Sequence, residues 1–230
     1  MIVSHAHRFI FLKTKKTAGT SIELALTELC GPQDVITPLT EIDEARRTNG
    51  RGAQNWPLHG WWDSPRPLFK RRWFKFTAAD YGFYNHMPAA EARARIGDKV
   101  WQSYFKFAFD RNPWDRQISW YFYKTKTKAS RPSFESFMAS RRRAYVANHE
   151  IYMEGGALAV DFLGRYENLD ADLAKALQMV GVARRLDVPK SNVTPNKETR
   201  QDYRSYYTPK TEALVRDWYA PEIELLNYGF

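Results

Sequence analysis

Residues 8–29 have the sequence RFIFLKTKKTAGTSIELALTEL, and this stretch decides the fold class. Its first part, residues 8–12, is a short apolar run of β-forming residues, which is typical of a buried strand. Residues 22–29 have the apolar spacing of a helix, and a glycine–proline pair follows them. Small and basic residues fill positions 13–21. The stretch therefore predicts a strand, a loop and a helix in direct succession.

The loop between this strand and helix has the composition of an anion cradle. A helix start offers unpaired backbone N–H groups and the positive end of the peptide dipoles. Gly19 lets the backbone turn tightly and approach a ligand, and Lys16 adds a mobile positive charge. Thr20 and Ser21 add hydroxyl donors, although either could instead cap the helix in an ordinary joint. The loop lacks the glycine that the Walker pattern places four residues before Gly-Lys-Ser/Thr, which disfavours a nucleoside triphosphatase.

A second strand and helix are predicted further along the chain. Aromatic residues alternate over 104–109, which favours a strand, and Pro113 suits the first turn of a helix that continues to about Lys124. Further elements are expected as a strand at 159–163 and helices at 88–96, 133–143, 168–180 and 209–226, with Pro221 as a point of bending. Strands that alternate with helices predict an α/β fold with a mostly parallel central sheet flanked by helices. Ligands of such sheets bind at the carboxyl ends of the strands.

Arg111 and Ser119 follow this second strand and are candidates for holding a second phosphate. An arginine offers a planar fork, and a serine offers a small donor. Asn112, Arg116 and Ser119 have the spacing to share one helix face. In the alternative, Arg111 or Arg116 pairs with a neighbouring aspartate, and Ser119 only packs. Two separate phosphate sites at one strand-end surface would suit a nucleotide with phosphates at both its 5′ and 3′ positions.

The composition of the 230 residues is that of an ordinary globular protein. A formal charge of +9 favours anionic partners. The single cysteine, Cys30, excludes an internal disulfide framework and a cysteine-rich zinc site. No apolar run approaches the roughly 18 residues of a membrane span, and no secretory signal is visible. We therefore expect one cytoplasmic domain over residues 1–230, without integral membrane association.

The two motifs resemble those of sulfotransferases, most closely the carbohydrate branch of the Golgi and of bacteria. The segment FLKTKKTAGTS, residues 11–21, is similar to the 5′-phosphosulfate-binding loop of that family. The segment FAFDRNPWDRQISWY, residues 107–121, is similar to its 3′-phosphate-binding segment. Residues 162–169 and 224–230 also resemble the carbohydrate branch. The resemblance covers roughly residues 8–30, 84–128 and 160–230.

The resemblance implies a P-loop-NTPase-like fold without nucleotide hydrolysis. It also implies 3′-phosphoadenosine 5′-phosphosulfate as the sulfuryl donor, with adenosine 3′,5′-bisphosphate as its product. By position, Lys16 would contact the bridging oxygen of the phosphosulfate, and Arg111 and Ser119 would bind the 3′-phosphate. The other loop residues assigned to the donor are Lys15, Thr17, Ala18, Gly19, Thr20 and Ser21. No metal is required, because a lysine and helix-start amides can neutralise the leaving group. The family usually has proline in place of Lys15 and an aliphatic residue in place of Asp110.

A base must take the proton of the acceptor hydroxyl, and histidine is suited to this near neutral pH. Among the five histidines, His86 lies just before a predicted helix. It resembles the histidine that serves as base in carbohydrate sulfotransferases, although a capping or packing role is the alternative. His59 is the second candidate, and Asp80 or Glu91 could serve instead.

The predicted function is transfer of a sulfuryl group by in-line displacement to a hydroxyl of a carbohydrate or glycoconjugate. Residues 31–83 and 129–159 lie outside the resemblance and are expected to be acceptor-binding insertions. A kinase-like nucleotide transferase is one alternative, which the absence of Gly-Lys-Ser/Thr opposes. A basic nucleic-acid-binding protein is another, but the sequence has no recognised motif for it, so we expect no nucleic-acid partner.

Overall fold

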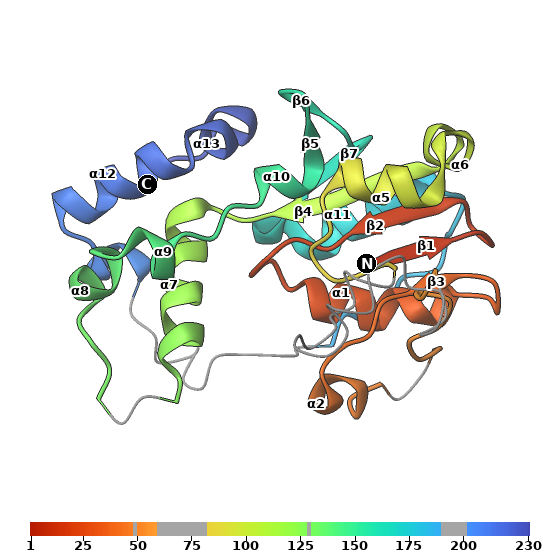
Figure 1. Ribbon diagram of the computed structural model, residues 1–230, viewed down its shortest axis with the longest axis horizontal. Helices are drawn as coiled ribbons and strands as arrows, with labels where there is room; N and C mark the ends of the chain where they lie inside the picture. The colour runs from red at the N-terminus through yellow and green to blue at the C-terminus, as the bar shows by residue number, and fades with distance from the viewer. Residues whose placement is uncertain (48–49, 59–81, 128–129, 190–201) are drawn as a thin grey trace, which may run out of the picture.

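The structure is a computed structural model that describes residues 1–47, 50–58, 82–127, 130–189 and 202–230. In these ranges a five-stranded sheet has the order β3-β1-β2-β4-β7 (Figure 1). Its strands are β1 (Ile2–Ser4), β2 (Phe9–Leu12), β3 (Val35–Ile36), β4 (Phe105–Asp110) and β7 (Phe162–Arg165). β2, β4 and β7 are parallel, and β1 is antiparallel to both of its neighbours. The prediction of a mostly parallel sheet in an α/β fold is confirmed.

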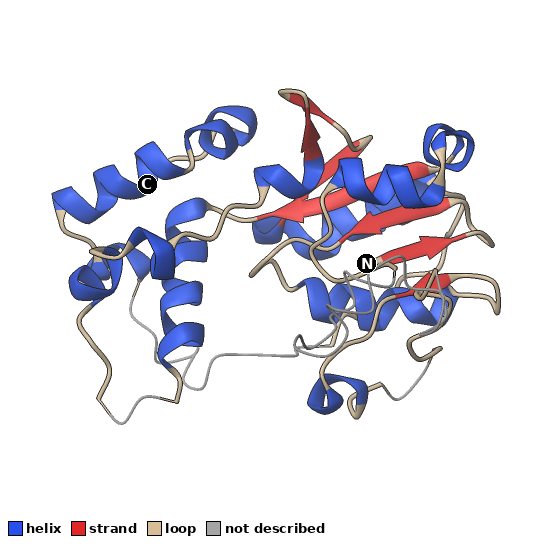
Figure 2. Ribbon diagram, viewed as in Figure 1, coloured by secondary structure: helices blue, strands red, loops and turns tan. Residues whose placement is uncertain are grey.

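Alternating side chains along β2 supply both faces of the sheet. Phe9 and Phe11 belong to one apolar cluster together with residues of α1 (Gly19–Leu26) and α11 (Leu169–Met179). Ile10 and Leu12 belong to another, which includes residues of α5 (Ala89–Ile96), α6 (Asp98–Ser103) and α10 (His149–Tyr152). Helices therefore cover both faces, as Figure 2 shows. The strand ends remain as the place where loops can receive a ligand.

A group of helices packs beside the sheet around an apolar cluster of its own. This helical group contains α7 (Pro113–Thr125), α8 (Phe134–Met138), α9 (Arg141–Ala144), α12 (Pro209–Trp218) and α13 (Ala220–Leu226). Trp114, Phe137 and Tyr219 are among its fully buried side chains. Figure 1 shows β4 leading into α7, so this strand and helix join the sheet to the helical group.

Shorter elements complete the part of the chain that the structure describes. They are η1 (Thr27–Leu29), α2 (Glu41–Glu44), the hairpin of β5 (Met153–Glu154) and β6 (Ala157–Leu158), η3 (Tyr166–Asn168) and η5 (Tyr203–Tyr206). None of the described helices is long and apolar enough to cross a membrane. No group of three or more His, Cys, Asp or Glu residues in the described ranges is arranged to hold a metal ion.

Three predicted elements differ from the observed ones. The strand expected at 159–163 begins three residues later, because the Ala159 N–H bonds to the Tyr152 carbonyl next to the β5–β6 hairpin. The helix expected at 133–143 is divided into α8 and α9, because the backbone of Ser140 is extended. The helix expected at 209–226 is divided at Tyr219, two residues before Pro221, whose missing N–H cannot continue a helix.

Candidate functional site

The two predicted phosphate-binding segments lie side by side. β2 and β4 are parallel neighbours with Leu12 paired to Ala108, so the segments that follow them leave the same edge of the sheet. Nη1 of Arg111 donates a hydrogen bond of 3.2 Å to the main-chain oxygen of Lys16. The loop after β2 therefore contacts the residue that follows β4, as the alternation of strands and helices predicts.

The first loop turns through two left-handed residues. Lys16 has a φ of 63° and Ala18 a φ of 60°. Non-glycine residues adopt this conformation at a cost, and such residues cluster at ligand clamps. α1 begins directly afterwards at Gly19, and in the described structure no side chain caps its start. A helix start of this kind is a place where backbone N–H groups and the helix dipole favour an anion.

Gly19 is required by close packing rather than by an unusual φ. A Cβ placed there would lie 2.8 Å from Cγ of Lys13 and 3.2 Å from the carbonyl oxygen of Thr14. The Lys13 side chain cannot easily withdraw, because its ammonium pairs at 2.7 Å with the fully buried Glu23. The helix start is consequently held tightly against the end of β2.

The threonine hydroxyls of the loop are directed inward. Oγ1 of Thr14 donates to the carbonyl oxygen of Phe109, and it lies 2.7 Å from Oγ1 of Thr17. The proton of the Thr17 hydroxyl is therefore used inside the loop and is not offered to a ligand. Thr20 is half-buried and Ser21 is buried at the start of α1.

The two lysines of the loop have different surroundings. The ammonium of Lys16 lies 4.4 Å from the ring centre of Tyr123. Burial and, after it, the positive charges of Arg111 and Lys126 together lower the pKa of Lys16 to about 8. The ammonium of Lys15 instead lies 3.4 Å from the carbonyl oxygen of Ala147, and burial lowers its pKa as well. Lys16 thus carries a charge that a nearby anion would stabilise.

His86 contacts the same loop through its imidazole ring. Its Nδ1 lies 3.0 Å from the carbonyl oxygen of Lys13. A carbonyl only accepts hydrogen bonds, so Nδ1 carries the proton and Nε2 keeps its lone pair. Burial lowers the pKa of His86 to about 4, with a contribution from the charge of Lys13, so the ring is neutral at pH 7. Nε2 is therefore the basic atom.

Of the other candidate bases, only Glu91 falls within the described residues. His59 and Asp80 lie outside the described residues. Glu91 lies on α5, where it accepts hydrogen bonds of 2.9 Å from the Tyr84 hydroxyl and from Arg95. Its carboxylate is already paired at the surface.

Arg111 is paired within the second segment. Its Nε and Nη2 donate to Oδ2 of Asp115 at 2.8 and 2.6 Å, and its guanidinium lies 4.2 Å from the ring centre of Tyr166. Arg111 is 7% exposed. The alternative in which Arg111 pairs with a neighbouring aspartate is thus present, and that aspartate is Asp115. Asp110 contacts Arg111 only by accepting a hydrogen bond from its backbone N–H.

The predicted helix face of Asn112, Arg116 and Ser119 is wrong for Arg116. That side chain is fully buried, and its guanidinium binds Asp110 at 2.7 Å and Glu222 of α13. Two buried carboxylates require a cation between them, which turns Arg116 inward. Ser119 is 7% exposed on α7, and Asn112 caps that helix by accepting from Trp114 N.

Sequence reasoning missed three residues that support the loops. Asn148, Tyr152 and Glu222 are fully buried and bond to Lys15, Asp110 or Arg116. No local pattern marks them, because each bond joins residues at least 42 positions apart. Only the folded structure, in which these distant residues meet, identifies them.

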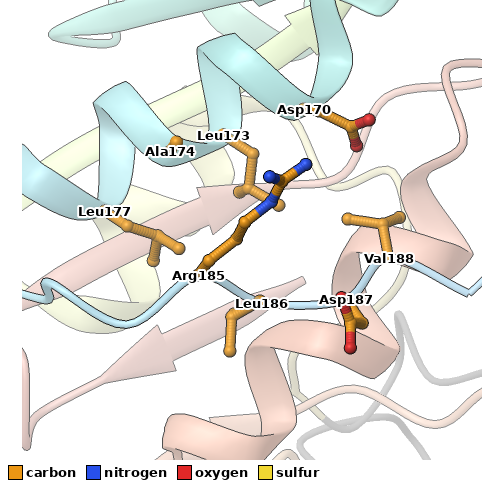
Figure 3. A pocket seen from close by; sticks show the side chains of 8 residues that line it. All are labelled: Asp170, Leu173, Ala174, Leu177, Arg185, Leu186, Asp187 and Val188. Atoms are coloured by element: carbon orange, nitrogen blue, oxygen red, sulfur yellow. The ribbon is translucent and has the colours of Figure 1, made fainter.

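Two hollows lie away from the loops. A cavity of about 170 Å³ lies between α11 and the segment around Leu186 (Figure 3). A neighbouring groove of about 620 Å³ extends along the same helix to Arg184. None of the candidate residues lines either hollow. The candidate site is therefore defined by the loop geometry at the strand ends.

Comparisons with known proteins bear on the chain as a whole. The family model described as "Sulfotransferase family" matches residues 1–229. An uncharacterized protein of Archaeoglobus fulgidus is 38% identical over 106 residues, which are 44% of this chain and 88% of that protein. No solved structure matches the chain.

Proposed function

The chain belongs to the sulfotransferase family, and we propose that its donor is 3′-phosphoadenosine 5′-phosphosulfate and its acceptor a hydroxyl of a carbohydrate or glycoconjugate. One observation carries this proposal: the Lys16 loop and Arg111 meet at the ends of two adjacent parallel strands. A nucleotide with phosphates at both ends of its ribose requires two basic segments at one surface. The resemblance to the carbohydrate branch suggests the acceptor class.

The described residues fit the donor. The uncapped start of α1, with Gly19 packed against Lys13, supports binding of the 5′-phosphate by the N–H groups of residues 17–21. Lys15 contributes through the position of its backbone. Arg111 and Ser119 hold the 3′-phosphate, and Arg111 then shares its N–H groups between that phosphate and Asp115. When bound, the donor supplies a sulfuryl group attached to a phosphate that can depart.

The chemistry is performed by Lys16 of the first loop and by His86, which is bonded to that loop. Lys16 holds its proton more firmly beside an anion, and its ammonium balances the charge of the leaving phosphate. His86 accepts the proton of the acceptor hydroxyl at Nε2, while its Nδ1–H remains bonded to Lys13 O. The base and the cation are thus held by one loop, three residues apart along the backbone. We also propose that residues 1–230 form one domain, in which residues 31–83 and 129–159 bind the acceptor.

Calorimetric titration with adenosine 3′,5′-bisphosphate tests the donor. We expect the parent protein to bind it and expect Lys16→Ala and Arg111→Ala to weaken binding roughly tenfold to a hundredfold, as for loss of a hydrogen bond to a charged group. Lys99→Ala, an exposed change on α6, is the control and should leave affinity unchanged. Absence of binding by the parent protein would contradict the proposal.

Transfer from a radiolabelled donor to a panel of oligosaccharides tests the base. We expect His86→Ala to keep the affinity for the bisphosphate and to lower the transfer rate by roughly 10²- to 10⁴-fold. Because the pKa of His86 is lowered to about 4, the parent rate should not fall between pH 7 and pH 5. Full turnover by His86→Ala would exclude His86 as the base.

A further inference from the structure

The side chain of Asn148 is fully buried between the first loop and the end of β4. Its Oδ1 accepts a hydrogen bond of 2.8 Å from Lys15 N, and its Nδ2 donates one of 3.1 Å to Lys15 O. The same Nδ2 donates to Oδ1 of Asp110 at 2.9 Å. One amide therefore contacts both segments that the proposed function assigns to phosphates.

These bonds fix the loop where its backbone is least favourable. The amide of Asn148 pairs with both the N–H and the C=O of Lys15, as a neighbouring strand would. The next residue, Lys16, has a φ of 63°, which a lysine adopts only where its surroundings hold it. Asn148 thus determines where the left-handed turn begins.

Asn148 is itself held rigidly. Its main-chain N–H donates to Oε1 of Glu222 at 2.6 Å. Glu222 and Asp110 both bind Arg116, and the Tyr152 hydroxyl donates to Asp110 at 2.6 Å. The segment that carries Asn148 crosses from α9 in the helical group to α10 on the sheet (Figure 1). A network of fully buried groups therefore leaves the amide little freedom to move.

The amide joins two equivalent positions of the two segments. Lys15 is the residue before Lys16, and Asp110 is the residue before Arg111. The main-chain N–H of Arg111 donates a hydrogen bond of 2.8 Å to Oδ1 of Asp110. On the basis of the proposed function, we propose that Asn148 is a positioning residue that sets the spacing between the 5′-phosphate loop and Arg111. It does so without touching the nucleotide.

The spacing matters only to a ligand that binds both segments at once. A bisphosphate gains the affinity of its second phosphate in full when the two sites are correctly separated. Adenosine 5′-phosphate has no 3′-phosphate, so its binding does not depend on that separation. Loss of the Asn148 amide should therefore weaken the bisphosphate more than the monophosphate, whereas a general loss of stability should not change their ratio.

Calorimetric titration of adenosine 3′,5′-bisphosphate and of adenosine 5′-phosphate measures this ratio. We expect the parent protein to prefer the bisphosphate, and we expect Asn148→Ala to reduce that preference by about tenfold. Asn148→Ser, which keeps one hydrogen-bonding group, should give an intermediate ratio and serves if Asn148→Ala does not fold. Thermal denaturation of each variant reports its folding.

Tyr152→Phe is the matched control. It removes a hydrogen bond from the same Asp110 carboxylate and leaves Lys15 untouched, so it should lower thermal stability without changing the ratio. The inference would be overturned if a folded Asn148 variant kept the parent's preference for the bisphosphate within twofold. It would also be overturned if Tyr152→Phe lost as much of that preference as the Asn148 variant. A parent protein that does not distinguish the two nucleotides would instead refute the proposed function.

Discussion

The loop after β2 and the segment after β4 are built in opposite ways. In the first, threonine hydroxyls turn inward and no side chain caps the start of α1, where we propose that backbone N–H groups bind the ligand. In the second, the charged side chains are already neutralised by carboxylates of the protein. Arg111 binds Asp115, and Arg116 binds Asp110. Ligand binding by the first segment would depend on the shape of its backbone. Ligand binding by the second would require an arginine to exchange its carboxylate partner for the ligand.

This difference shows that two arginines of one motif can have different tasks. Arg111 lies beside the first loop and contacts Lys16 O, whereas Arg116 is fully buried five residues later. We propose that the first meets a ligand, whereas the second holds the C-terminal helix α13 through Glu222. Charge and spacing alone do not separate these roles.

The largest expected effect separates the two arginines by stability. Arg116→Ala leaves Asp110 and Glu222 buried without their cation, so the free energy of unfolding should fall by about 3–5 kcal/mol. Arg111→Ala leaves Asp115 partly exposed to water, so it should lower the free energy of unfolding much less. Urea denaturation of both variants measures the contrast. Equal stability losses would show that the two arginines have the same task.

Gly19→Ala tests whether the first segment depends on shape. The new Cβ would lie 2.8 Å from Cγ of Lys13, which is held by Glu23, so the helix start must shift. A shift of this size should weaken binding of adenosine 3′,5′-bisphosphate by about a hundredfold. Gly52→Ala, where a Cβ meets nothing within 4 Å, is the matched control. Unchanged affinity in Gly19→Ala would contradict a tightly fitted cradle.

The pH dependence of binding tests the proposed role of the Lys16 ammonium in the first segment. The pKa of Lys16 is lowered to about 8 by burial and then by Arg111 and Lys126, so the free ammonium is lost as the pH rises through 8. Only the ammonium attracts a phosphate, so affinity should fall above pH 8 by at most about tenfold per pH unit. Titrations in buffers of different ionisation enthalpy should also detect proton uptake at pH 8. Lys16→Met should show neither effect, and a parent protein without proton uptake would contradict the assignment.

Asp115→Asn should change binding only slightly, and it tests whether Asp115 competes with the ligand for Arg111. Removal of its charge frees Arg111 from a competing anion, so the bisphosphate should bind about two- to fivefold more tightly. Titration at two salt concentrations measures this change. Weaker binding would mean that Asp115 serves to orient Arg111 and does not compete with the ligand.

Local signals predicted the parts of the fold that local interactions form. The apolar run before Lys13 and the aromatic alternation before Arg111 correspond to β2 and β4, and Pro113 begins α7 as expected. β1 and β3 were not predicted, because strands of three and two residues carry little pattern. Their place in the sheet comes from pairing with partners distant in the chain.

In the site, too, local sequence predicts only the features that neighbouring residues form. The positions of Lys16, Gly19 and Arg111 follow from a loop after each strand, which a sequence reveals. The pairing of Arg116 with Glu222 joins residues 106 positions apart, and that of Asn148 with Lys15 joins residues 133 positions apart. Such contacts depend on how the helical group docks against the sheet, so no sequence window contains them.

The central claim is that the two segments hold opposite ends of one nucleotide. A crystal structure of the complex with adenosine 3′,5′-bisphosphate tests it most directly. We expect the 5′-phosphate at the N–H groups of residues 17–21 with Lys16 beside it, and the 3′-phosphate within hydrogen-bond distance of Arg111 and Ser119. Density that places either phosphate away from its segment, or the nucleotide elsewhere on the protein, would contradict the claim.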